Sequence, residues 1–310
     1  MASEIDLSVQ IANLTLQNPL VLASGVMGSS PGLLHRVALS GAGAVTAKSC
    51  GPHPRAGHPN PVMVAWEHGL LNAIGLTNPG VEAEIALLKE VKALLQPLGV
   101  PLFASIFAGT MDEFGLVAAL AAKAEPDLIE VNISCPNVHD DLGMPFAADH
   151  LSAAGVTRAV RREVKDIPIA VKLAPNVPDI GRIAEAVVDA GADAINAVNT
   201  MPGMIIDVDA ARPVLHNRTG GISGPALKPI AIRCVAEIAQ HVGVPIIGTG
   251  GVLSGRDAIE MMMAGATAVG VGSALWFRGP DAFRLITAEM SEFMEQKGIG
   301  SVNELIGKAI

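Results

Sequence analysis

The chain is built around the run Leu128-Ile129-Glu130-Val131-Asn132-Ile133-Ser134-Cys135-Pro136-Asn137. Aliphatic and β-branched residues in its first half favour a buried strand, and Pro136 cannot donate a hydrogen bond to a continuing strand. The strand therefore ends at a rim, where Cys135 follows amide and hydroxyl side chains. A thiol in such a place could act as an acid, a base or a nucleophile. The alternative is a small buried hydrophobe, which is what most cysteines are.

The same pattern, an apolar strand with a helical segment after it, recurs along the chain. The predicted strands are Leu20–Gly25, Ala44–Cys50, Pro101–Ala108, Leu128–Ser134, Ile169–Ala174, Ala194–Thr200, Pro245–Gly250 and Ala268–Ala274. The segments with helical spacing of apolar residues are Gly32–Leu39, Val81–Leu95, Asp112–Ala124, Asp149–Val164, Asp179–Ala190, Ala226–His241, Gly255–Ala264 and Asp281–Gln296. Apolar-Pro steps and helix-stopping glycines join each helix to the next strand within a few residues.

Repeated β-α units with short αβ turns predict an α/β protein with the architecture of a (β/α)8 TIM barrel. The weak alternation over Asp6–Leu16 predicts an N-terminal hairpin, and residues 1–310 are interpreted as one domain. An open doubly wound sheet stays possible, because periodicity does not show closure. Three long βα connections, Gly51–Gly80, Pro136–His150 and Met201–Gly224, follow strand ends. Barrel enzymes place their sites on that face, so we expect the function there.

Composition narrows the class of protein. The formal net charge of -9 argues against nucleic-acid binding, and the low charged fraction of 16% suits a sheet buried on both faces. Cys50, Cys135 and Cys234 are dispersed, which predicts no disulfide framework and indicates a reducing cytoplasm. We expect neither a signal peptide nor a membrane span. His53 and His58 lie in a Pro/Gly loop and are interpreted as surface histidines, so no metal site is predicted.

Polar residues gather at the ends of the predicted strands. They are Ser24-Gly25, Lys48-Ser49, Ser105, Asn132 with Cys135, Lys172, Asn199-Thr200, Gly250-Gly251 and Gly272-Ser273. Lys172 lies in an apolar strand, and a buried ammonium needs an anion or a polarisable acceptor beside it. That acceptor could be a ligand, or Glu130 on the preceding strand in a salt bridge. Lys48 leaves the same two alternatives open.

Two glycine runs late in the chain indicate a phosphate site. Gly248–Gly251, followed by a helix start at Ser254-Gly255-Arg256, and Gly270–Ser273 lie where barrels bind phosphate with backbone N–H groups and a helix N-terminus. Tight turns are the alternative for either run alone. Neither run completes a dinucleotide-binding fingerprint. A planar cofactor with a phosphate fits these residues, and flavin mononucleotide (FMN) is a reasonable candidate.

Several motifs together resemble a known family. Asn132–Asn137 is similar to the active-site signature of class 1 dihydroorotate dehydrogenases, and Leu71–Gly80 resembles the substrate loop of their NAD-linked branch, class 1B. Further matches occur in the same order at Asn18–Gly25, Lys48-Ser49, Asn199-Thr200, Ile222–Pro225, Gly248–Gly251 and Gly270–Ser273. The fumarate-using branch has a different loop at Asn72–Gly75. Class 2 enzymes carry an N-terminal extension and a serine in place of Cys135.

The resemblance implies oxidation of dihydroorotate to orotate, in pyrimidine biosynthesis, with hydride transfer to FMN. It makes Cys135 the catalytic base for the C5 proton, Lys48 a catalytic neighbour of flavin and substrate, and Lys172 the group that stabilises negative charge on the reduced flavin. The implied substrate residues are Lys48, Asn72, Ala73, Ile74, Gly75, Leu76, Asn132, Asn199 and Thr200. The implied cofactor residues are Ala23, Ser24, Gly25, Lys48, Ser49, Ser105, Asn132, Lys172, Val198, Gly224, Gly250, Gly251, Gly272 and Ser273. Ser105 departs from the family, which often has asparagine there.

The resemblance also implies a partner. Class 1B enzymes need a second subunit that carries FAD and a [2Fe–2S] cluster, through which electrons reach NAD, and three scattered thiols in this chain cannot ligate such a cluster. We therefore expect a heterotetramer on a homodimeric core, without nucleic acid or membrane. Three other interpretations stay open: an FMN barrel acting on uracil or thymine, a flavin-free phosphosugar isomerase or synthase, and a non-catalytic scaffold subunit.

Overall fold

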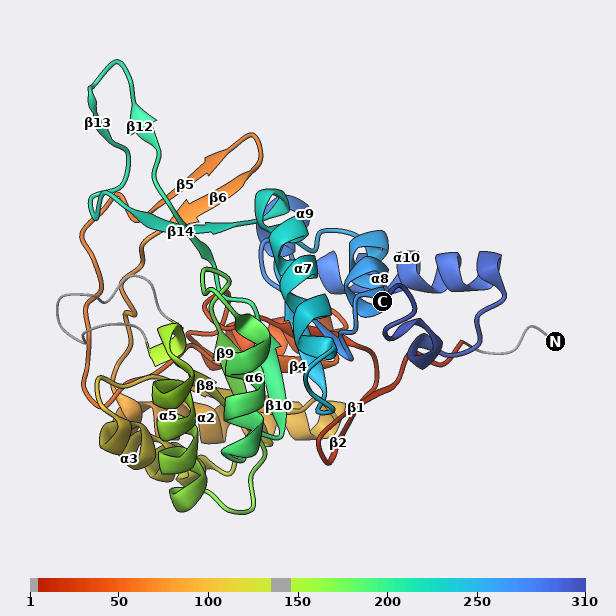
Figure 1. The fold of residues 1–310 in the computed structure, drawn as a ribbon, viewed down its shortest axis with the longest axis horizontal. Coiled ribbons are helices and arrows are strands. Elements are labelled where there is room, and N and C mark those ends of the chain that lie inside the picture. Colours follow the sequence, from red (N-terminus) through yellow and green to blue (C-terminus); the bar gives the residue numbers. More distant parts are fainter. Residues whose placement is uncertain (1–4, 135–145) are drawn as a thin grey trace.

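A closed parallel barrel forms the centre of the computed structural model, which describes residues 5–134 and 146–310 (Figure 1). Its strands are β3 (Leu20–Leu22), β4 (Ala44–Thr46), β7 (Leu102–Ile106), β8 (Leu128–Asn132), β9 (Ile169–Leu173), β10 (Ala194–Ala197), β15 (Ile246–Thr249) and β16 (Ala268–Val271). The strand order is β10-β15-β16-β3-β4-β7-β8-β9, and the barrel closes where Val269 of β16 pairs with Leu20 of β3. The predicted TIM barrel is thus confirmed, and the open sheet is excluded.

Helices surround this barrel at the predicted places. They are α1 (Pro31–Leu39), α2 (Val81–Leu95), α3 (Met111–Ala121), α5 (His150–Glu163), α6 (Ile180–Asp189), α7 (Lys228–Ala239), α8 (Gly255–Met263) and α10 (Ala282–Lys297). Side-chain caps fix several starts: Thr110 and Glu113 form a capping box on α3, and the carboxylate of Asp179 accepts the N–H of Arg182 on α6. Short 3-10 turns lie at Gln96–Leu98, Ala122–Ala124, Phe146–Ala148, Pro225–Leu227 and Val302–Leu305.

The carboxyl ends of the strands were predicted too long. The segment Ala44–Cys50 was expected as one strand, but β4 ends at Thr46, and Cys50 forms only an isolated bridge with Ile106. Likewise, the segment Ala268–Ala274 was expected as one strand, but β16 ends at Val271, and Ala274 begins a short helix, α9 (Ala274–Arg278). Cys50 and Ala274 are buried although they lie beyond the strand ends. Hydropathy therefore does not show where the pairing of the strands stops.

A second sheet, which the sequence did not predict, is built from two of the long βα connections. Strands β5 (Met63–Trp66), β6 (Gly69–Asn72), β11 (Met201–Gly203) and β14 (Gly220–Ser223) form an antiparallel sheet in the order β11-β14-β6-β5. A small hairpin of β12 (Ile206–Asp207) and β13 (Arg212–Pro213) extends beyond this sheet (Figure 1). The predicted N-terminal hairpin is confirmed as β1 (Val9–Ile11) and β2 (Leu14–Leu16).

One apolar cluster holds the barrel and its helices together and includes residues from Val9 to Leu305. The two end segments meet, since the N–H of Asp6 donates to the carbonyl of Gly300 at 2.9 Å and the N–H of Val302 donates to the carbonyl of Asp6 at 2.8 Å. Across the described ranges, no helix has both the length and the apolar character needed to cross a membrane.

Candidate active site

A cavity of about 480 Å³ lies at the carboxyl ends of the barrel strands. Its volume is typical of sites for small ligands and cofactors, and this is the face where barrel enzymes carry out their chemistry. Most of the residues predicted from the sequence line it together: Ala23, Ser24, Gly25, Lys48, Ser49, Asn72, Ile74, Gly75, Leu76, Asn132, Lys172, Val198, Asn199, Thr200, Gly224, Gly250, Gly251, Gly272 and Ser273.

Cys135 lies outside the described residues, so its predicted role as the base stays a prediction. Two other predicted site residues, Ala73 and Ser105, do not line the cavity. Ala73 is buried behind the lining, with its N–H donating to the carbonyl of Val62 at 2.8 Å. Ser105 is also buried behind the lining, in a hydrogen bond of 2.7 Å between its hydroxyl and that of Ser49. Ala73 and Ser105 therefore support the wall from behind.

The lining also contains residues that the sequence did not single out: Val26, Met27, Met63, Leu70, Ser223, Leu227, Thr249, Val252, Gly270, Leu275 and Trp276. Thr249 and Gly270 are inside the quoted glycine runs, so their position was a usable signal. Met63 and Leu70 belong to β5 and β6, and Trp276 to α9. None of these three elements was predicted, so their residues could not be placed at the mouth.

The loop from Asn72 to Asn78 is held against the segment before it. The backbones of Arg55 and Asn78 exchange hydrogen bonds of 2.9 and 3.0 Å, and the side chain of Arg55 donates from Nε to the carbonyl of Gly75 at 3.0 Å. Gly75 has a φ of +80°, and a Cβ there would lie 2.7 Å from the backbone nitrogen of His58. Only glycine fits this close approach, which turns Ile74 and Leu76 toward the cavity.

His58 was predicted as a surface histidine, and this interpretation is wrong in part. The residue is half-buried behind the loop, its backbone N–H donates to the carbonyl of Ile74 at 3.0 Å, and its Nδ1 is buried without a hydrogen-bond partner among the described residues. His53 is exposed, as predicted. The Pro/Gly composition of the segment indicated a loop but did not show that part of it packs inward.

Amide side chains surround the end of β8. The side chain of Asn199 donates to the carbonyl of Ser134 at 2.9 Å, and the Oδ1 of Asn132 accepts the N–H of Ser134 at 3.3 Å. The Nδ2 of Asn132 donates to the hydroxyl of Ser49 at 3.4 Å. These contacts hold the last described residue before Cys135 beside the cavity. Amides at this wall can both donate to and accept from a planar polar ligand.

Lys172 and Lys48 both line the cavity. Lys172 is 4% exposed, and its Nζ donates to the hydroxyl of Ser24 at 2.9 Å. Its Nζ also lies 3.9 Å from a carboxylate oxygen of Glu130, so the alternative of an ion pair between these neighbouring strands holds at the outer limit of contact. The two alternatives for Lys172 are therefore compatible: one lysine contacts an internal carboxylate and also faces the ligand space.

A glycine-lined end of the cavity is formed by Gly224, Gly250, Gly251 and Gly272. Gly224, Gly250 and Gly251 have φ values of +86°, +144° and +73°, which side chains rarely adopt. A Cβ on Gly272 would meet no atom closer than the Cβ of Ala23 at 3.5 Å, so the missing side chain leaves open space. Backbone N–H groups in such a turn form a concave site for an anion.

The N-terminus of α8 does not contribute to this glycine-lined end, contrary to the prediction from Ser254-Gly255-Arg256. The N–H of Gly255 donates to the carboxylate of Glu289 at 2.6 Å, and Ser254 and Asp257 form a capping box. Burial alone would raise the pKa of Asp257, but hydrogen bonds from Lys228 and Ser254 outweigh it and lower the pKa. The protein's own carboxylates thus occupy the donors of this helix.

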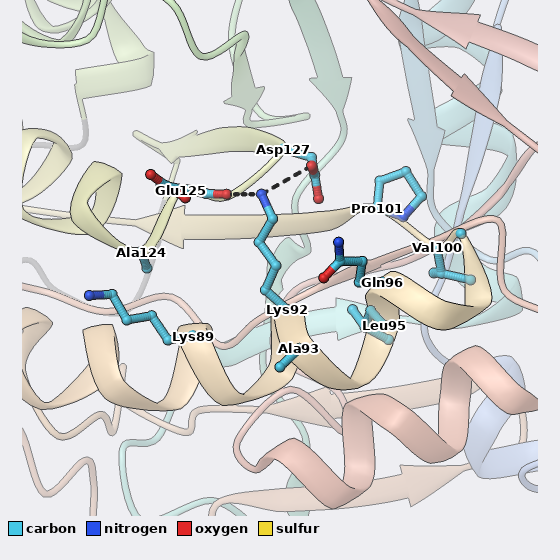
Figure 2. A pocket seen from close by; sticks show the side chains of 11 residues that line it. Lys89, Lys92, Ala93, Leu95, Gln96, Val100, Pro101, Ala124, Glu125 and Asp127 are labelled. Carbon is cyan, nitrogen blue, oxygen red and sulfur yellow. Dashed lines mark hydrogen bonds and ion pairs between the residues drawn. The ribbon is translucent and has the colours of Figure 1, made fainter.

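A second cavity, of about 630 Å³, lies at the opposite, amino-terminal end of the strands (Figure 2). Lys92 crosses it and donates to the carbonyl of Glu125 and, at 3.3 Å, to the carboxylate of Asp127. Asp127 in turn accepts the N–H of Leu102 at 2.8 Å, at the start of β7. These polar contacts hold the residues before β8 against the first residue of β7. Such a stabilising role is typical of this face of a barrel.

Fold and cavity together define a (β/α)8 barrel enzyme that binds its ligand at the carboxyl ends of its strands. The family model described as dihydroorotate dehydrogenase matches residues 6–294. The chain belongs to the dihydroorotate dehydrogenase family and is an oxidoreductase of this generally flavin-dependent family. The family recognised from the motifs is thus confirmed.

Curated relatives from three organisms carry one name, "Dihydroorotate dehydrogenase B (NAD(+)), catalytic subunit". The protein of Methanothermobacter thermautotrophicus is 43% identical over 304 residues, which are 98% of each chain. The protein of Methanocaldococcus jannaschii is 43% identical over 308 residues, 99% of each chain. The protein of Geobacter sulfurreducens is 45% identical over 303 residues, 97% of each chain.

Proposed function

We propose that this chain is the catalytic subunit of an NAD-linked dihydroorotate dehydrogenase, which oxidises (S)-dihydroorotate to orotate in de novo pyrimidine biosynthesis. The observation that carries the proposal is a conjunction within one cavity. The loop at Asn72–Leu76, the amide side chains of Asn132 and Asn199, and the glycine-lined end all face the same space. A carboxylated pyrimidine and a phosphate-bearing flavin need these kinds of groups in this arrangement.

FMN fits the residues present. Gly25 and Gly272 line the cavity, and a Cβ on either would meet no protein atom closer than 3.5 Å, so side chains are missing where a flat ring system needs room. The N–H groups of Gly250, Gly251 and Ser273 would hold the phosphate, and Lys172 would lie at the pyrimidine end of the ring. When bound, the flavin supplies the acceptor for a hydride. Val198, which is also predicted to contact the cofactor, lines the same cavity.

The substrate would lie against the loop and the amides. Ile74, Gly75 and Leu76 line the cavity, and their backbone N–H groups would bind the carboxylate. Asn72, Asn132 and Asn199 can match the alternating N–H and C=O groups of a pyrimidine edge. The hydroxyl of Thr200 and the ammonium of Lys48 complete the set.

Proton removal is assigned to Cys135. A thiol titrates closer to neutrality than a carboxylate, and a nearby cation can favour its thiolate. Cys135 directly follows Ser134, whose carbonyl is held by Asn199 at 2.9 Å. In this scheme the thiolate takes the C5 proton of dihydroorotate.

The partner belongs to the same proposal: a homodimer of this chain with a subunit that carries FAD and a [2Fe–2S] cluster. Cys50 and Cys234 are buried, and burial raises the pKa of both thiols. Protonated, enclosed thiols are poor ligands for iron, which supports a cluster on another chain. Residues 1–310 would act as one FMN-binding domain in the cytoplasm. Co-purification of the co-expressed partner subunit tests the complex, and cell fractionation tests the cytoplasmic location.

The decisive experiment combines a spectrum with two assays. The purified protein should show an oxidised flavin spectrum, release FMN on denaturation, and turn over dihydroorotate but not dihydrouracil. NAD reduction should appear when the partner subunit is added. Preferential turnover of dihydrouracil would favour the uracil or thymine alternative. A colourless protein without flavin would favour a phosphosugar enzyme.

A further inference from the structure

Glu130 lies inside the barrel, one layer below the cavity. Its side chain is 3% exposed, at a depth where barrels usually hold branched aliphatic residues. Asn132, two residues further along β8, points to the same side of the strand and lines the cavity. A carboxylate at this depth is unfavourable unless donors match it.

Donors from three other strands meet this carboxylate: β7 and β9, which flank β8, and β10, which lies beyond β9. The hydroxyl of Ser105 donates to its Oε1 at 2.8 Å, and the amide of Asn196 donates to its Oε2. The ammonium of Lys172 lies 3.9 Å from Oε1. Both oxygens therefore have a partner, and the ammonium of Lys172, which contacts the carboxylate, also lines the cavity.

Two hydrogen-bonded chains connect the carboxylate to other parts of the cavity wall. Through Ser105 it reaches the hydroxyl of Ser49, at 2.7 Å from the hydroxyl of Ser105. Through Asn196 it reaches Thr249, whose hydroxyl donates to Oδ1 of Asn196 at 2.9 Å. Ser49 and Thr249 both line the cavity. One buried charge thus orients three sides of the site without touching the ligand space.

We propose that Glu130 is a positioning residue that sets the charge Lys172 presents to the bound flavin, and so lowers the reduction potential of that flavin. The inference rests on the proposed function, since it requires FMN in the cavity. A positive charge beside the pyrimidine end of a flavin favours the reduced, anionic form. A carboxylate in contact with that charge offsets part of it, and it does so strongly where water is excluded. The flavin can then pass electrons onward as well as receive them.

The test is Glu130→Gln, which removes the charge and keeps the shape. The hydrogen bonds can be retained, because Ser105 can donate to the new amide oxygen, and the amide of Asn196 can rotate to accept from the new amide nitrogen. We expect the midpoint potential of bound FMN to become more positive. In single-turnover experiments, reduction of the bound flavin by dihydroorotate should not slow, whereas reoxidation of the reduced flavin by the partner subunit should slow by about tenfold.

Glu84→Gln is the matched control. At pH 8, above the raised pKa of Glu84, it removes the charge of another buried glutamate, which lies on α2 outside the barrel and does not line the cavity, and it should leave the potential unchanged. A merely structural role for Glu130 predicts weaker FMN binding and slower reaction in both directions, with no shift in potential. That result would overturn the inference.

A second pair of variants keeps the test decisive if Glu130→Gln does not fold. Lys172→Met alone leaves a buried carboxylate unpaired, and adding Glu130→Gln removes it. Because Glu130 is proposed to act through Lys172, the potential of the double variant should equal that of Lys172→Met, and a higher potential in the double variant would show that Glu130 acts on the flavin directly and would overturn the inference. A parent protein without flavin would overturn the proposed function together with this inference. Flavin bound at an unchanged potential in all variants would overturn the inference alone.

Discussion

The two ends of the barrel both contain a cavity with a lysine and carboxylates, but the lysines differ in burial and surroundings. At the amino-terminal end, the side chain of Lys92 is 36% exposed and bonds to groups that start the next strands (Figure 2). At the carboxyl end, Lys172 is 4% exposed and lies between an internal carboxylate and open ligand space. An exposed ion pair is screened by water and adds little, whereas a buried charge next to a cavity acts on whatever binds there.

The largest expected effect tests whether chemistry is confined to the carboxyl end. Cys135→Ser should lower turnover of dihydroorotate at neutral pH by about 10²–10⁴-fold, because a serine hydroxyl is a far weaker acid than a thiol. Part of the activity should return as pH rises. Steady-state rates between pH 6 and 10 measure both points. Undiminished activity of the complex would instead indicate a scaffold subunit.

A smaller effect should follow from filling the cavity. Gly272→Val adds a branched side chain to the cavity wall, where a Cβ would make only ordinary van der Waals contacts, at 3.5 Å with the Cβ of Ala23 and 3.7 Å with Val26, so we expect FMN affinity to fall about 100-fold, with the fold intact. Flavin fluorescence titration and circular dichroism measure binding and folding. The control is Gly243→Val, where a Cβ meets no atom within 4 Å and which does not line the cavity. Equal FMN affinity in both variants would contradict the assignment.

Glu84 sharpens the contrast between a paired and an unpaired charge. Burial raises its pKa from 4.5 to about 7, and its Oε1 has no hydrogen-bond partner in the part of the chain that the structure describes. Because the folded pKa lies above the unfolded one, ionisation costs stability as pH rises from 4.5 to about 7. Glu84→Gln should remove this cost, at most about 3 kcal/mol at pH 8, and change little at pH 4.5. Denaturant unfolding at both pH values checks it, and equal gains at both would contradict it.

The smallest effect is expected at the amino-terminal cavity. Lys92→Met should cost about 0.5–1 kcal/mol of stability and leave turnover unchanged, because the ion pair with Asp127 is partly exposed. Thermal unfolding and a steady-state assay with dihydroorotate measure the two quantities. A loss of turnover without a loss of stability would show that this face takes part in function.

Local patterns predicted much of the fold and the polar residues at the strand ends, and the family resemblance added the Asn72–Leu76 loop to the predicted cavity lining. The bounds of α2 agree with the prediction at both ends, since Val81 begins and Leu95 completes one apolar face. The second sheet was missed because strands such as Met201–Gly203 and Gly220–Ser223 are short and rich in Gly and Pro, without alternation. These two strands pair with each other, and β14 also pairs with β6, a long-range contact that no local pattern contains.

The order of residues was sufficient for the repeated units, the strand-end polar groups and the family, because hydrophobic period and turn chemistry act within a few residues. Closure of the barrel, the meeting of Lys172 with Ser24 across 148 positions, and the carboxylate of Glu130 beneath the cavity required the folded chain. These features join distant segments, and their energies depend on which groups exclude water together. The sequence predicts that Lys172 is buried, but only the folded chain shows which groups surround the charge and how far away they lie.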